Sequence, residues 1–158
     1  MAQVFARDCQ NGVFPGITNE RLEREFGPQV KLSPGVPEWF DRITAFGKTV
    51  GLEISHHVIS SGAEPFIRGT AVFPYLSSLD SGEFIEGEEG ISGVKNLVGS
   101  FVKVEALKKI CKGGDIFDDL ARSEYDVEHG RVFVFGDGQT DRSMFRYMLQ
   151  RGGRSLAV

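Results

Sequence analysis

The sequence has few cysteines, no excess of positive charge and no long apolar run, and each shortage excludes a class of protein. Cys9 and Cys111 show neither metal-ligand spacing nor the pattern of a disulfide-stabilised small domain, so we expect two reduced thiols. The first ten residues lack the continuous apolar segment of a signal peptide. The longest apolar run, 132–135, is far too short to cross a membrane. We therefore expect a cytoplasmic protein with no membrane partner.

The charge balance argues against nucleic acid as a partner. The chain has 18 Lys and Arg against 22 Asp and Glu, a net charge of −4, whereas phosphate-backbone binding requires a positive face. A local basic pocket for a small anionic molecule remains compatible with this balance. The 158 residues, 41% hydrophobic and 25% charged, are typical of one globular domain, and we find no repeat or low-complexity tract.

The spacing of apolar residues predicts alternating helices and strands. Thr18 resembles a helix N-cap before 19–26, in which Leu22 and Phe26 share a face. Helix 102–112 should bury Val102, Ala106, Leu107 and Ile110 and expose its lysines. The other predicted helices are 37–46, a short piece near 66–67 and 141–150, and the strands are 52–60, 79–85, 131–135 and 154–158, with a loop or hairpin at 86–100. This alternation indicates an α/β fold, a parallel sheet with helices on both faces.

The most informative stretch is VFVFGDGQTDRSMF, an apolar strand followed by a glycine-rich loop and a helix. Asp137 lies at the carboxyl end of the strand, where open parallel sheets bind ligands, and Asp141 opens the helix with Phe145 and Met148 on its buried side. Two carboxylates there suit Mg²⁺. The alternative is a plain turn and a helix-start acid favoured by the dipole.

Two weaker candidates for phosphate binding lie upstream. Ser60 ends the predicted strand 52–60, and Ser61 and Gly62 form the turn after it. A hydroxyl and free N–H groups there can bind a phosphate oxygen, although the same residues also end ordinary strands. Lys103 stands in the first turn of a helix, where the helix dipole disfavours a cation. It therefore either requires a compensating anion or is an exposed surface charge. His56 and His57 point to opposite faces of their strand, so we expect packing roles and no shared metal.

Taken in order, these segments resemble motifs II, III and IV of the haloacid dehalogenase superfamily. VISSG resembles motif II, Lys103 in FVKVEALKKICKG resembles motif III, and GDGQTDRSMF resembles motif IV. The similarity extends over 17–158, including LSPGVPEWFDRI and HHVISSGAEPFIRGT, and points to a phosphoserine-phosphatase-like bacterial subgroup.

The resemblance implies a three-layer Rossmann-like fold and a Mg²⁺-dependent phosphatase acting on a small phosphorylated metabolite. In the family an aspartate attacks phosphorus, and water cleaves the aspartyl-phosphate. Carried over, Asp137 binds the metal and Asp141 supports the metal site directly or through water. Lys103 and Ser60 bind phosphate, together with the turn of Ser61 and Gly62. Ser61 takes the place of Ser60 if the alignment at the strand end shifts by one residue.

One part of the family pattern is missing. Motif I, a strand ending in Asp-x-Asp-Gly-Thr, supplies the nucleophile and the central strand, but only VFARDCQNGVF precedes the other motifs and Asp8 has no second aspartate at that spacing. We therefore interpret 1–16 as the remnant of a cap or linker and 17–158 as a partial core, truncated before motif I. The central strand edges would then be exposed and open to another chain or copy.

Three functions compete at this point. The first is a phosphatase that gains its nucleophile from a segment outside this sequence. The second is a non-catalytic phosphate- or metal-binding module, or a fragment that complements another chain. The third, a nucleotide-binding Rossmann domain, is disfavoured because no G-x-G-x-x-G follows a strand.

Overall fold

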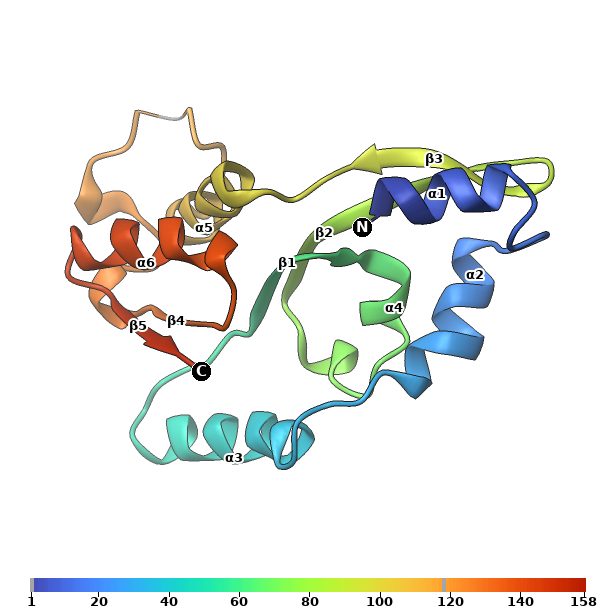
Figure 1. Cartoon of the computed structure of the whole chain (residues 1–158). Coiled ribbons are helices and arrows are strands. Elements are labelled where there is room, and N and C mark those ends of the chain that lie inside the picture. Colours follow the sequence, from blue (N-terminus) through green and yellow to red (C-terminus); the bar gives the residue numbers. More distant parts are fainter. Residues whose placement is uncertain (1, 118) are drawn as a thin grey trace. The chain divides into compact units, whose positions relative to one another are not determined.

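Helices and strands alternate along the computed structural model, which describes residues 2–117 and 119–158 (Figure 1). Two residues lie outside the described ones: Met1 of the predicted 1–16 segment and Asp118 of the predicted partial core. The predicted α/β class is confirmed. The chain divides into two units, Met1–Leu97 and Val98–Val158, and each is described by itself. The three-layer arrangement and the division into 1–16 and 17–158 stay predictions.

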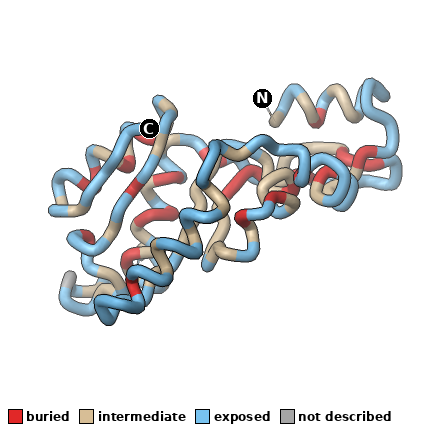
Figure 2. Tube along the Cα trace, turned by 90° about the horizontal axis from the view of Figure 1, so that it is seen from below, coloured by how far each residue is buried: buried red, intermediate tan, exposed pale blue. Residues whose placement is uncertain are grey.

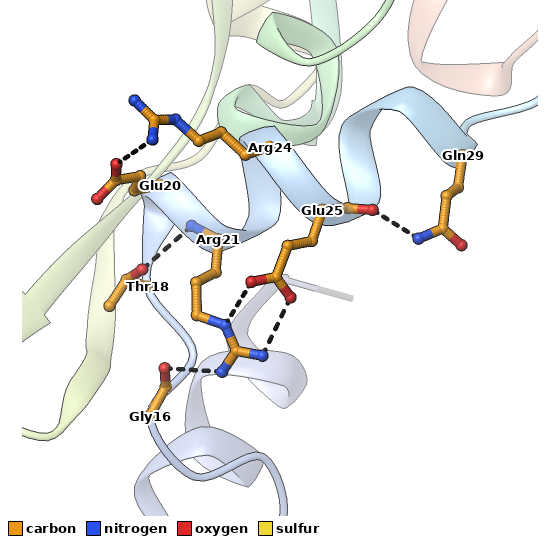
Figure 3. A network of polar contacts seen from close by, with 7 residues as sticks. All are labelled: Gly16, Thr18, Glu20, Arg21, Arg24, Glu25 and Gln29. Atoms are coloured by element: carbon orange, nitrogen blue, oxygen red, sulfur yellow. Dashed lines mark hydrogen bonds and ion pairs between the residues drawn. The ribbon is translucent and has the colours of Figure 1, made fainter.

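The first unit begins with helix α1 (Ala2–Gln10), followed by a helical segment whose start the sequence predicts correctly. This segment consists of α2 (Asn19–Arg21), a π-helical turn η1 (Leu22–Phe26) and a 3₁₀ turn η2 (Gly27–Gln29). The Thr18 hydroxyl caps it by accepting a hydrogen bond from the Arg21 N–H at 3.1 Å. On its exposed side, Arg21 contacts both Glu25 oxygens and the Gly16 carbonyl (Figure 3).

Two further helical segments of this unit also match their predictions. The first is α3 (Val36–Thr49), and the second is α4 (Glu64–Arg68), which precedes a 3₁₀ turn η3 (Phe73–Tyr75). Gly69, at the end of α4, lies against η1 so closely that an added Cβ would stand 2.0 Å from the Glu23 carbonyl oxygen. Glycine is therefore the residue that allows these two elements to approach each other.

The sheet of the first unit is mixed. Strand β1 (His57–Ala63) runs parallel to β2 (Ser78–Gly87), and β2 forms an antiparallel hairpin with β3 (Gly90–Asn96). The hairpin alternative for 86–100 is thus confirmed. Helix α1 packs on β3, and the core between them contains Ala6, Ile17, Leu22, Phe84 and Ile91.

The predicted strand 52–60 and its turn at Ser61 and Gly62 are wrong in position. The strand begins at His57 and continues through Ser60, Ser61 and Gly62 to Ala63. Its regular pairing with β2 stops at Ile59, and three β1 residues then lie opposite a single β2 residue before Ala63 pairs with Gly82. Ser60 to Gly62 therefore form a β-bulge, which a local reading of small residues cannot distinguish from a turn.

The second unit contains a short parallel sheet. Helix α5 (Ser100–Lys112) leads through two 3₁₀ turns, η4 (Arg122–Glu124) and η5 (His129–Arg131), to strand β4 (Phe133–Gly136). A 3₁₀ turn η6 (Gln139–Asp141) and helix α6 (Arg142–Leu149) then connect β4 to β5 (Arg154–Ala157). The two strands pair in parallel, and within residues 2–117 and 119–158 no other strand pairs with them.

Burial in this unit corrects two expectations. Helix α5 buries Lys103 at 5% exposure, together with Ala106, Leu107 and Cys111, whereas Val102 is 37% exposed. Ala106 and Leu107 are buried as predicted. The other two buried positions are shifted by one residue, to Lys103 and Cys111, so the buried stripe includes a lysine. On the apolar strand β4, Val134 is buried but Phe133 and Phe135 are exposed. Figure 2 marks the buried positions in red.

Three more observations complete the description. On α6 the buried residues are Met144, Tyr147 and Met148, so of the two predicted residues Met148 is fully buried and Phe145 only partly. Cys9 and Cys111 form no disulfide, and burial raises the pKa of the Cys111 thiol to about 11, which keeps it protonated at neutral pH. Among the described residues, none of the helices has the length and apolar character to cross a bilayer.

Candidate functional site

The loop between β4 and α6 is organised around the side chain of Asp141. The Oδ2 atom of Asp141 accepts a hydrogen bond from the Gly138 N–H at 3.0 Å, which closes the loop back on the start of α6. A Cβ added to Gly136 would lie 2.7 to 2.8 Å from atoms of this carboxyl group. The glycine at the end of β4 therefore makes room for the Asp141 carboxylate.

The other oxygen of Asp141 binds Lys103. The Nζ atom of Lys103 lies 2.6 Å from Oδ1, and the two side chains are only 6% and 7% exposed. The anion that the position of Lys103 requires is thus part of the chain itself. A buried ion pair of this kind joins α5 to the loop after β4, and it is costly to break from one side because the remaining charge stays buried without a partner.

The pair keeps Asp141 ionised. Burial alone would raise the pKa of this carboxyl group, but the hydrogen bonds from Lys103 and from the Gly138 and Asp137 N–H groups outweigh it. The pKa of Asp141 therefore lies below its ordinary value of 3.8. At neutral pH the carboxylate is a permanent acceptor, with both oxygens in use.

Asp137 is placed differently from Asp141. It follows β4 directly, its side chain is exposed, and its carboxylate forms no hydrogen bond or ion pair with another residue that the structure describes. Within the described residues there is also no group of three or more His, Cys, Asp or Glu side chains that could hold a metal ion. Of the two predicted metal-binding carboxylates, Asp137 thus has oxygens available for an external cation, while those of Asp141 bind protein donors.

The predicted phosphate-binding residues of the first unit lie in the bulge of β1. The Ser60 hydroxyl accepts a hydrogen bond from the Gly62 N–H at 3.0 Å, and Ser61 and Gly62 are exposed. The hydroxyl proton of Ser60 therefore remains available for an acceptor such as a phosphate oxygen. Ser60 belongs to a different unit from Lys103 and Asp137, so their predicted meeting at one sheet edge stays a prediction.

The two histidines have separate surroundings, although His56 lies just ahead of β1 and not on it. His56 contacts the Thr44 hydroxyl at 3.1 Å and the ring of Phe40, whereas His57 lies between the hydroxyls of Ser55 and Ser78 at 3.0 and 2.7 Å. Burial lowers the pKa of both imidazoles. Both are therefore neutral side chains in hydrogen-bonded positions at pH 7.

One buried polar pair escaped the sequence analysis. His129 Nε2 lies 3.0 Å from the Tyr147 hydroxyl, and both side chains are buried, so the pair fastens η5 to α6. The residues are far apart in the sequence, and the acidic stretch around His129 shows no helical or strand periodicity. No local signal marks this contact.

Comparison with known proteins finds a distant relative of this chain. No protein-family model matches the chain. An uncharacterized protein of Borreliella burgdorferi is 23% identical over 164 aligned positions, which cover 91% of this chain. The chain spans 57% of that protein's length.

Proposed function

We propose that this chain carries the phosphate-binding and Mg²⁺-binding part of a phosphohydrolase of the haloacid dehalogenase type. The observation that supports this most is the buried ion pair between Lys103 and Asp141, directly under the Gly-Asp-Gly loop at the carboxyl end of β4. The proposal includes the finer fold, a three-layer Rossmann-like sheet that a motif I strand would complete, and a small phosphorylated metabolite as substrate.

Lys103 is the group that would neutralise a phosphate oxygen. Its ammonium has three N–H donors, and Asp141 is its one hydrogen-bond acceptor among the residues that the structure describes. Two donors thus remain for a ligand, and a buried ammonium interacts with an anion more strongly than an exposed one. Asp141 acts here as a positioning residue, because it fixes the Nζ atom beside the loop.

Asp137 fits the role of the metal-binding residue. Mg²⁺ commonly uses one or two protein carboxylates, with water and substrate phosphate completing its coordination, and the Asp137 oxygens are accessible at the strand end. When bound there, Mg²⁺ would supply charge neutralisation and orientation of the phosphoryl group. In the first unit, the Ser60 hydroxyl, whose proton is not used by the Gly62 contact, is proposed to donate a hydrogen bond to a phosphate oxygen.

A second candidate is a phosphate-binding module without catalysis. Asp8, the aspartate of the segment that stands where motif I would be, lies within helix α1 and not at the end of a strand. The proposed enzyme therefore needs an aspartate from a segment or chain outside this sequence. The longer Borreliella burgdorferi relative has the length to hold such a segment.

Thermal unfolding and turnover together test the proposal. We expect orthophosphate plus Mg²⁺ to raise the melting temperature of the chain, and Asp137→Asn to abolish this rise without lowering the melting temperature of the free protein, because Asp137 is exposed. Asp119→Asn, another exposed carboxylate, is the matched control. An equal rise for wild type and Asp137→Asn would contradict the proposal. Hydrolysis of p-nitrophenyl phosphate then separates the enzyme from the binding module.

A further inference from the structure

A basic groove runs between helices α5 and α6 of the second unit, apart from the residues proposed to bind phosphate. It has a volume of about 360 Å³, and its walls include Phe101, Val104, Lys108, Arg142, Arg146 and Tyr147. Three of these side chains are cations, and Glu105 is the only acidic residue that lines the groove. The groove is therefore positive on a chain whose net charge is −4.

The two arginines of the groove differ from three helical arginines of the first unit. Arg21, Arg24 and Arg68 each pair with a glutamate one helical turn away. Arg142 and Arg146, in contrast, stand one turn from each other on α6, and neither has an ion-pair partner in the part of the chain that the structure describes. Like charges at this spacing destabilise a helix, and an external anion bound by both arginines would reduce their mutual repulsion.

Apolar and aromatic surface accompanies these charges. Phe101 is 87% exposed, which leaves most of a large apolar side chain in water beside the cations. Tyr147 forms the floor, with the Lys108 Nζ atom 5.7 Å and the Arg151 guanidinium 4.0 Å from the centre of its ring. Arginine and aromatic residues of this kind are enriched in protein–protein interfaces.

We propose that the α5–α6 groove is a docking surface for an acidic segment of a partner protein. Carboxylates of that segment bind Arg142, Arg146 and Lys108, and one apolar side chain packs against Phe101 and Val104. Charge complementarity selects the occupant: the groove carries three cations against one anion, and Arg binds carboxylates through paired hydrogen bonds. An amphipathic helix lying in a groove between two helices is a common arrangement of this type. The proposal is independent of the phosphohydrolase function.

Fluorescence anisotropy with a labelled synthetic peptide tests this inference. The probe peptide places Asp and Glu on one helical face and Leu and Phe on the other. One matched peptide replaces the acidic residues by Asn and Gln, and a second replaces the apolar residues by Ser. We expect saturable binding of the probe and weaker binding of both matched peptides. The variant R142Q/R146Q should weaken binding of the probe by about tenfold or more, and Phe101→Ser should weaken it as well.

The variant K109Q/R131Q is the control, because it removes two exposed cations of the same unit that lie outside the groove. It should bind the probe like the wild type. Circular dichroism establishes that each variant is folded. The inference is wrong if the 158-residue chain does not bind the probe, if the control variant loses as much affinity as R142Q/R146Q, or if a single-stranded oligonucleotide binds more tightly than the probe at the same salt concentration.

Discussion

Asp141 is the residue whose side chain joins most of the candidate site. It accepts hydrogen bonds from Lys103 on α5 and from Gly138 in the loop after β4, and it does so while 5% exposed. Replacing it removes the one acidic partner that the buried Lys103 ammonium has among the residues that the structure describes. Its contribution is therefore first one of stability and positioning.

We predict that Asp141→Asn lowers the free energy of unfolding by about 3–5 kcal/mol, because Lys103 is left as an uncompensated buried charge. Urea denaturation at neutral pH measures this loss. The exposed residue Asp119 provides the control, since Asp119→Asn should change stability by less than about 0.5 kcal/mol. A loss for Asp141→Asn no larger than that of the control would show that the ion pair does not support the fold.

The same residue predicts an acid dependence of stability. A carboxyl group whose pKa is lowered on folding stabilises the native state fully above its unfolded pKa, and this contribution disappears as the pH falls toward the folded value. For Asp141 the loss should begin near its ordinary pKa of 3.8 and continue below it. Denaturation across this range should show a component of acid destabilisation in the wild type that is missing in Asp141→Asn. Identical pH profiles would contradict the assigned shift.

At the scale of elements, the contact between η1 and α4 depends on the absence of a side chain at Gly69. An added Cβ would stand 2.0 Å from the Glu23 carbonyl oxygen and 2.6 Å from Gly27 Cα, both backbone atoms that cannot move without shifting an element. We predict that Gly69→Ala destabilises the first unit by about 1–3 kcal/mol. Gly93→Ala is the control, because its Cβ would meet Ile85 at an ordinary 3.6 Å. Chemical denaturation in which both variants unfold alike would contradict this packing.

The elements also show what the sequence alone can predict. The sequence predicts helices such as α3 and α5 correctly, because apolar spacing and flanking glycines are signals that lie within a few residues of each helix. The bulge in β1 was missed because it arises from pairing with β2, whose residues lie about twenty positions further on. Part of the buried face of α5 differs by one residue from the prediction, because an amphipathic pattern assigns lysine to the exposed face. Lys103 is buried because it pairs with Asp141, which lies 38 residues further along the chain.

At the scale of the whole molecule, the proposed function depends on residues from both units. Lys103, Asp137 and Asp141 belong to the second unit, and the strand–loop–helix pattern of β4 and α6 predicts that the two aspartates share one loop. Ser60 belongs to the first unit, and no local sequence pattern indicates its distance from the others. We therefore predict that Lys103 and Asp137 of the second unit bind phosphate and Mg²⁺ at the loop after β4, and the contribution of Ser60 is a separate prediction for the first unit.

Calorimetric titration of orthophosphate in the presence of Mg²⁺ tests this prediction most directly, with the wild type, Asp137→Asn and the control Asp119→Asn. If Asp137 holds the metal that accompanies the phosphate, Asp137→Asn weakens binding, whereas Asp119→Asn binds like the wild type. If Asp137→Asn binds phosphate like the wild type, or if the chain does not bind phosphate with Mg²⁺ at all, the proposed site does not exist.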